Sequence, residues 1–268
     1  MPSLSSHPWR LPWPAVVVVI ATGVAYVALA EAGWPGVPSA CAEGPACWCE
    51  ARSPGWIREP WNTWSNLPTL LGALWVAGLA HGAGSGWRAG VLSTFAYGLW
   101  AQGAGALMFH GSLTQWSRDL DQGSILVVWG AVLCTSLVRL GWLPPSRLLP
   151  AVMASTVAGL IVIFGLELPI DPAGLTCLAT FAVLEVLIRR RHGPVADPRW
   201  FRLAVGAFGV AMLSWTASLP MSPLCAAGAP VHALWHVAAG LAVTALAVHA
   251  ASSGVHVAAP TGGTLPRT

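Results

Sequence analysis

The chain has 268 residues, of which 55% are hydrophobic and only 9% are charged. Because a typical soluble domain carries about 25% charged residues, this composition excludes an ordinary soluble globule. The same apolar composition also argues against nucleic-acid binding, disorder and collagen, and the net charge is only +3. Together with a mean hydropathy of +0.65, the composition predicts a multi-pass membrane protein.

Eight apolar segments are long enough, or nearly long enough, to cross a bilayer, which takes about 20 residues each. They are continuous, whereas barrel strands would alternate in short pieces, so helices are favoured. The predicted spans are residues 14–30, 62–80, 89–110, 121–141, 148–165, 172–188, 201–219 and 231–250. We predict an all-α fold: a polytopic membrane helical bundle with a seven-helix core and one extra N-terminal span or signal peptide.

Residues 1–30 fit a transmembrane segment or a cleavable signal peptide, because Arg10 precedes an apolar run that ends in Ala28-Leu29-Ala30. We expect an extracytoplasmic Cys-containing segment at 31–58, the membrane domain at 59–253 and a disordered tail at 254–268.

The arginines predict the orientation of the bundle. If the first segment starts inside, all but three of the 13 basic residues fall in inner loops or termini, and only Arg52, Arg58 and Arg118 lie outside. The positive-inside rule then places residues 31–58 outside and the C-terminus in the cytoplasm. Arg without Lys indicates a GC-rich genome, so we expect a bacterial inner membrane.

Four cysteines, Cys41, Cys47, Cys49 and Cys225, are predicted on the outer side, and Cys134 and Cys177 within spans. An oxidising compartment would allow two disulfides with three connectivities, among them Cys49–Cys225, and the alternative is unpaired or metal-bound thiols.

A cluster of ionisable residues is predicted in the outer leaflet. His232 and His236 are four residues apart, on one face of a helix. His110 ends a span that runs outward and Asp121 opens the next, so a hairpin sets both at a similar depth. Three histidines from two helices form the ligand set of a catalytic zinc site, with Asp121 as general base or partner of a ligand. The alternative is a structural polar network.

Other polar residues have simpler explanations. Glu185 precedes Arg189 by four residues, which predicts a local ion pair. Glu59, Asn62, Ser65 and Asn66 share roughly one helical face, where they either cap the helix or contact metal or substrate.

At these residues the chain resembles the alkaline ceramidase family, part of a superfamily of seven-helix membrane hydrolases that includes the adiponectin-receptor-like proteins. The matching blocks are Trp48-Cys49-Glu50, Glu59-Pro-Trp-Asn-Thr-Trp-Ser-Asn-Leu67, Phe109-His110 with Asp121 following, and His232-Ala-Leu-Trp-His236 followed by Gly240-Leu241. The resemblance implies a zinc amidase that cleaves ceramide, with zinc on His110, His232 and His236 and with Asp121 assisting the catalytic water.

The chain departs from this family at two places. Ala106 stands where the family has a Ser one turn before the first zinc histidine. In the family's calcium site, Trp48, Glu50 and Glu59 match, but Cys47 and Arg52 replace two oxygen ligands. Because calcium needs six to eight oxygens, we expect no calcium. Arg58 or a disulfide of Cys47 would hold this segment instead.

The sequence therefore predicts a zinc-dependent hydrolase of linear amides that acts on ceramide or a related N-acyl lipid. One alternative is a non-catalytic or receptor-like member of the superfamily that retains a structural zinc, and another is a b-type haem or ion-translocating protein. The expected partners are a lipid substrate and the bilayer, with no nucleic acid and no prediction of oligomeric state.

Overall fold

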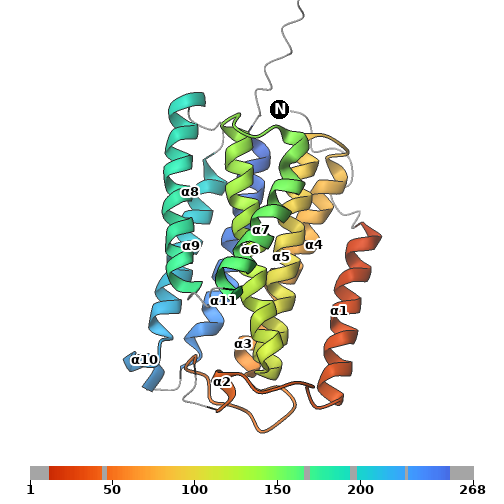
Figure 1. Cartoon of the computed structure of the whole chain (residues 1–268), viewed down its shortest axis with the longest axis vertical. Helices are drawn as coiled ribbons and strands as arrows, with labels where there is room; N and C mark the ends of the chain where they lie inside the picture. Colours follow the sequence, from red (N-terminus) through yellow and green to blue (C-terminus); the bar gives the residue numbers. More distant parts are fainter. Residues whose placement is uncertain (1–11, 44–46, 166–169, 194–197, 227–228, 254–268) are drawn as a thin grey trace, which may run out of the picture.

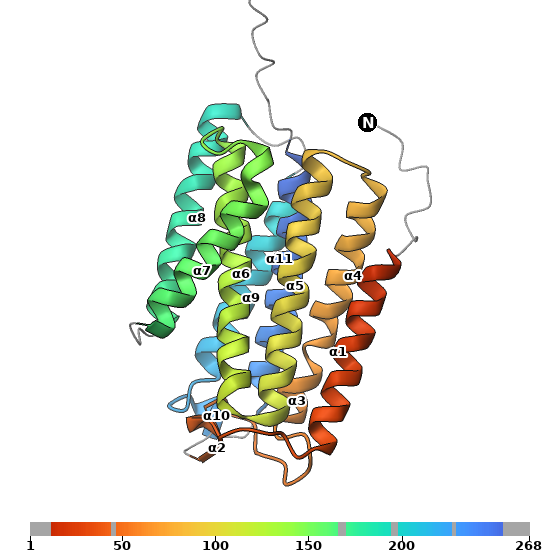
Figure 2. The ribbon, with the colours of Figure 1, turned by 45° about the vertical axis from the view of Figure 1, so that its right-hand side comes forward.

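A computed structural model describes residues 12–43, 47–165, 170–193, 198–226 and 229–253. Its long helices run side by side in one bundle (Figures 1 and 2), and the described ranges contain no strand, which confirms the predicted all-α fold. The long helices are α1 (Trp13–Glu31), α4 (Leu67–Gly82), α5 (Trp87–Ser112), α6 (Gln115–Arg139), α7 (Leu148–Gly165), α8 (Ile170–His192), α9 (Arg199–Ala217) and α11 (Val231–Ser252). The tail at 254–268 lies outside the described residues.

Five helices in the described ranges are long and apolar enough to cross a membrane. They are α1, α6, α7 together with the 3-10 turn η1 (Pro145–Arg147), α9 and α11. The protein is therefore a multi-pass membrane protein. Helix α1 lies at the edge of the bundle against α4 and α5 (Figure 2).

The second predicted span is broken. Helix α3 (Pro60–Trp64) ends at Ser65, and α4 begins at Leu67. Pro68 has no N–H to donate to the carbonyl of Trp64, so a continuous helix would lose a hydrogen bond there. The break makes α3 a separate short helix at the end of the bundle (Figure 2).

Helix α11 packs against α4, α5 and α9. Its buried face is rich in small residues, which let helix backbones approach closely in a membrane. At Gly240 a Cβ atom would collide with the side chain of Thr69 on α4 and lie 3.2 Å from its Cα. The hydroxyl of Thr69 also donates to the carbonyl of His236 at 3.4 Å, so this contact sets the depth of α11 beside α4.

We call the end of the bundle where α5 finishes and α11 starts the histidine end, and the opposite end, where α8 finishes at Arg189–His192, the arginine end. Residues 32–43 and 47–59 cross the histidine end and include α2 (Ala40–Glu43). Two disulfides hold this segment. Cys41 pairs with Cys47, and Cys49 pairs with Cys225 in α10 (Pro223–Ala226). Of the three disulfide connectivities that the sequence left open, the structure has the one that includes Cys49–Cys225.

Toward the arginine end, Glu185 does not pair with Arg189 as the local spacing predicted. The Glu185 carboxylate instead accepts from the guanidinium of Arg139 on α6, and His249 on α11 lies 3.6 Å from its other oxygen. Arg189 sits over the ring of Phe201, 4.3 Å from its centroid. The prediction was wrong because contacts between helices outweighed the contact within α8. Arg139, Glu185 and His249 form a buried polar network that joins α6, α8 and α11.

Candidate metal centre

The C-terminus of α5 brings Glu59 to His110. The last carbonyls of a helix have no partner within it and need donors from elsewhere. Here the N–H of Glu59 donates to the carbonyl of His110, and the N–H of Arg58 donates to that of Gly111, both at 3.0 Å. These two hydrogen bonds hold the start of α3 against the end of α5. They place the Glu59 side chain directly beside the His110 ring.

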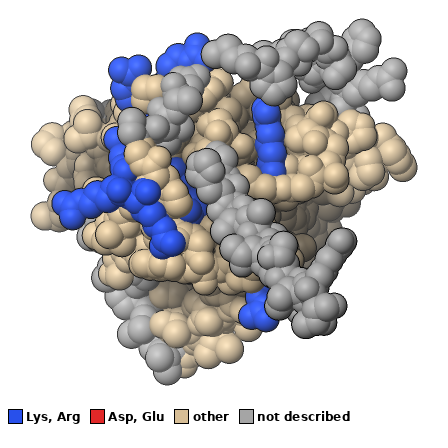
Figure 3. All heavy atoms as spheres, turned by 90° about the horizontal axis from the view of Figure 1, so that it is seen from above, with Lys and Arg blue, Asp and Glu red and all other residues tan. Residues whose placement is uncertain are grey.

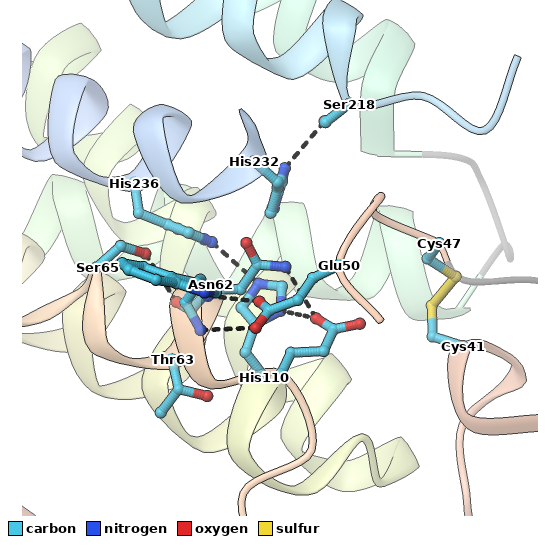
Figure 4. A network of polar contacts seen from close by, with 12 residues as sticks. Cys41, Cys47, Glu50, Asn62, Thr63, Ser65, His110, Ser218, His232 and His236 are labelled. Carbon is cyan, nitrogen blue, oxygen red and sulfur yellow. Dashed lines mark hydrogen bonds and ion pairs between the residues drawn. A yellow bond between two sulfur atoms is a disulfide. The ribbon is translucent and has the colours of Figure 1, made fainter. Parts of the chain in front are cut away.

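The three predicted histidines meet at the histidine end of the bundle. Each offers one nitrogen, and the three nitrogens lie within 4.8 Å of one another. The Nε2 atoms of His110 and His236 are 3.0 Å apart, and all three side chains are buried. Figure 4 shows the rings from α5 and from the first turns of α11 pointing toward one another. This group could hold a metal ion.

Two side chains orient the histidine rings. Glu59 Oε2 lies 2.6 Å from Nδ1 of His110, and the hydroxyl of Ser218 lies 3.2 Å from Nδ1 of His232. A protonated Nδ1 that donates to such an oxygen leaves Nε2 free as a ligand, which is the usual arrangement around a metal-binding histidine. Ser218 was not predicted, because it follows α9 with no motif to mark it.

The segment before α3 covers the histidines. Trp48 stacks on His232, with ring centroids 4.1 Å apart. The carboxylate of Glu50 accepts from the backbone N–H groups of Trp61 and Asn62 at 2.7 and 2.8 Å. Burial raises the pKa of Glu50, whereas these hydrogen bonds lower it. Cys49 lies between Trp48 and Glu50 in the sequence. Its disulfide with Cys225 therefore ties both residues to α10, the short helix that precedes α11.

The predicted carboxylate, Asp121, lies in the second turn of α6, because α6 begins at Gln115 rather than at 121. It is half-buried, at the point where α6 packs closely against α5. The close approach depends on Gly105, where a Cβ atom would lie 3.0 Å from Cα of Asp121 and 3.0 Å from the carbonyl oxygen of Leu120. The absent side chain lets the backbones of α5 and α6 touch five residues before His110, so Asp121 lies deeper along α5 than the hairpin prediction placed it.

The second predicted polar group divides between two roles. Asn62 is fully buried and donates to Glu59 Oε2 at 3.1 Å, so it supports the carboxylate that orients His110. Ser65 and Asn66 instead donate to the backbone carbonyl of Asn62, at 2.9 and 2.8 Å. These two side chains hold together the break between α3 and α4.

The structure also places Ala106 and Cys47, two positions at which the sequence departs from the family that it resembles. Ala106 is 1% exposed and lies one turn before His110. The nearby hydroxyl of Ser112 contacts Ser117 at 2.7 Å and therefore does not replace the missing serine. Cys47 is in its disulfide with Cys41, beyond Glu50 in Figure 4.

Replacing Glu59 with Gln tests the role of its carboxylate. We expect zinc affinity to fall about 10- to 100-fold, the usual cost of losing a carboxylate partner of a metal-binding histidine. Zinc competition with a chromogenic chelator measures this. Glu31→Gln, an exposed residue near the same end, is the matched control. Unchanged zinc affinity in Glu59→Gln would contradict the role.

No family model matches the chain, and no curated protein matches it either. The interpretation of the site therefore depends on its geometry and chemistry.

Proposed function

We propose that the protein is a zinc-dependent membrane amidohydrolase that cleaves the amide bond of ceramide or a related N-acyl lipid. The observation that carries this proposal is the convergence of three buried histidine nitrogens within 4.8 Å, beside the face of α5 on which Asp121 packs at Gly105. Ionisable side chains are rare within membrane spans and usually mark function. The resemblance to the alkaline ceramidases supplies the substrate class.

The residues fit zinc. Two nitrogens on one tetrahedral zinc lie about 3.3 Å apart, given Zn–N bonds of about 2.0–2.1 Å. The Nε2 atoms of His110 and His236 are 3.0 Å apart, and the oxygens of Glu59 and Ser218 at the opposite ring nitrogens leave Nε2 of His110 and His232 free. Three neutral imidazoles are the protein ligand set of catalytic zinc sites, where the fourth position stays open.

The chemistry can be assigned to the side chains that are present. A zinc ion held by His110, His232 and His236 would polarise the scissile carbonyl and make water more acidic. Asp121 accepts a proton from the attacking water and then delivers it to the departing nitrogen. Water contributes the new C–O bond as the C–N bond breaks, so the products are a fatty acid and an amine. Glu59 and Ser218 keep the histidine rings in place, and Trp48 covers His232.

The proposed orientation follows from the arginines. Seven of them lie at or next to helix ends at the arginine end, and Figure 3, which views this end, shows basic side chains and no acidic ones among the atoms it colours. They are Arg88, Arg147, Arg189, Arg190, Arg191, Arg199 and Arg202. By the positive-inside rule this end faces the cytoplasm, which puts the histidines on the extracytoplasmic side of a bacterial inner membrane.

A second function, that of a receptor-like protein with a structural zinc, is favoured by one observation. The buried residue one turn before His110 is Ala106, which offers no hydroxyl to the site. Removing one donor to a developing oxyanion can cost on the order of 10²- to 10³-fold in rate. Release of product from the lipid panel described next separates the two functions.

Replacing Asp121 with Asn is the direct test of catalysis. We expect zinc to stay bound, while kcat on short-chain N-acyl lipids falls about 10²- to 10⁴-fold through loss of the proton carrier. Mass spectrometry of fatty acid release, with and without chelator, measures this. Asp119→Asn, two residues earlier on α6 and bonded to Gln115, is the matched control. Fatty acid release by wild type that chelator does not reduce, or full activity in Asp121→Asn, would refute the mechanism, and no release from any lipid would favour the receptor.

A further inference from the structure

A large, partly open cavity lies among the helices, between the histidine cluster and the arginine end. Its volume is about 610 Å³, and it is lined by α6, α8, α9 and α11 together with Gln102 of α5. Apart from Gln102, Glu185 and Arg189, the lining side chains are aliphatic or aromatic. Cavities of this size and composition hold the apolar part of a small ligand.

None of the three histidines lines the cavity, but it begins close to them. Its lining residue Ile125 lies one turn beyond Asp121 on α6, and Ala239 lies three residues beyond His236 on α11. The cavity reaches the level of Glu185, near the opposite end of the same helices. An acyl chain whose carbonyl lies at the histidines would therefore extend into it.

Gln102 is the polar lining residue without a partner. Arg189 sits over Phe201, and Glu185 accepts from Arg139 through one oxygen and lies 3.6 Å from His249 through the other. The side-chain oxygen of Gln102, in contrast, is buried and makes no hydrogen bond within the described residues. Buried polar groups nearly always have a partner, so a polar atom without one in an apolar cavity points to a ligand.

The chemistry and depth of Gln102 define that partner. A carboxamide both donates and accepts, and a hydroxyl group can do the same. A charged ligand group would be buried here without a counter-ion beside Gln102, which is costly. Gln102 lies eight residues before His110, or about 12 Å along the helix at about 1.5 Å per residue. At that distance from the carbonyl an extended acyl chain has reached its middle carbons.

We propose that the acyl chain of the substrate carries a hydroxyl group at mid-chain and that Gln102 hydrogen-bonds to it. This inference rests on the proposed function, because it takes the amide to lie at the histidines. It makes Gln102 a specificity-determining residue that selects among acyl chains and takes no part in the cleavage of the amide.

Binding to the intact protein in detergent tests the proposal without hydrolysis. Trp129, Trp215 and Trp235 line the cavity, so dibrominated stearate bound there quenches tryptophan fluorescence. Unlabelled stearate, 10-hydroxystearate and 2-hydroxystearate then compete with it. We expect 10-hydroxystearate to displace the quencher at about three- to tenfold lower concentration than the other two, the value of one hydrogen bond.

The variant Gln102→Leu, similar in size but apolar, should bind stearate as wild type does and lose the preference for 10-hydroxystearate. Gln115→Leu, outside the cavity, should keep it. Equal displacement by all three acids in wild type, or a preference that survives in Gln102→Leu, would overturn the proposal. A preference without hydrolysis of any amide would refute the proposed function alone, and hydrolysis without a preference would refute only the role of Gln102.

Discussion

Replacing His232 with Ala is expected to remove bound zinc and amide hydrolysis together. His232 supplies one of the three nitrogens, and its ring stacks on Trp48 and contacts Ser218. Two histidines bind zinc far more weakly than three, because each ligand contributes to both affinity and geometry. Elemental analysis of the purified variant and mass spectrometry of released fatty acid measure the two losses.

The control for this experiment is His81→Ala, which removes an exposed histidine at the far end of α4. It should retain both zinc and activity. If His232→Ala kept stoichiometric zinc, the assignment of the metal centre would be wrong. If it lost zinc but kept hydrolysis, the metal would be structural and the hydrolytic mechanism would fall.

Replacing Arg139 with Leu is expected to destabilise the bundle by about 3–5 kcal/mol, because it leaves the Glu185 carboxylate buried and without its main partner. The free energy of unfolding in detergent and SDS mixtures measures this change. The double variant Arg139→Leu with Glu185→Leu should recover most of the loss, since an apolar pair replaces both charges. A double variant as unstable as Arg139→Leu would show that the carboxylate is not the cause.

Arg147→Leu provides the matched control for charge removal at the arginine end. Its side chain is exposed beside α7, and exposed charges contribute little to stability. We expect a change within about 0.5 kcal/mol, as for other surface substitutions. An equal loss in Arg147→Leu and Arg139→Leu would mean that net charge, rather than the buried network, determines stability.

The helical bundle was predictable because each span appears in the sequence as a continuous apolar run. That His110, His232 and His236 lie at the same end of the bundle was predictable for the same reason, since span order fixes the end at which each helix begins or finishes. The break between α3 and α4 had a signal in Pro68, but the apolar run continues through it. Helix boundaries therefore carried more uncertainty than helix order.

Contacts between side chains were harder to predict. Glu185 has Arg189 four residues away in the sequence, yet the structure pairs it with Arg139 from another helix. Local spacing cannot reveal which helix faces which. Similarly, Ser218 has no motif, and Cys41, Cys47, Cys49 and Cys225 left three pairings open, which only the fold resolves by bringing Cys49 to Cys225.

The Cys49–Cys225 disulfide sets an order of events during biosynthesis. The bond spans 176 positions of the sequence, so it can close only after every helix from α3 to α9 has been synthesised. Trp48 reaches its place on His232 from a segment that this late crosslink secures. If Cys49 and Cys225 stayed in a reducing cytosol, the crosslink would not form. Recombinant protein should therefore be produced in a host in which both cysteines face a compartment that contains thiol oxidases.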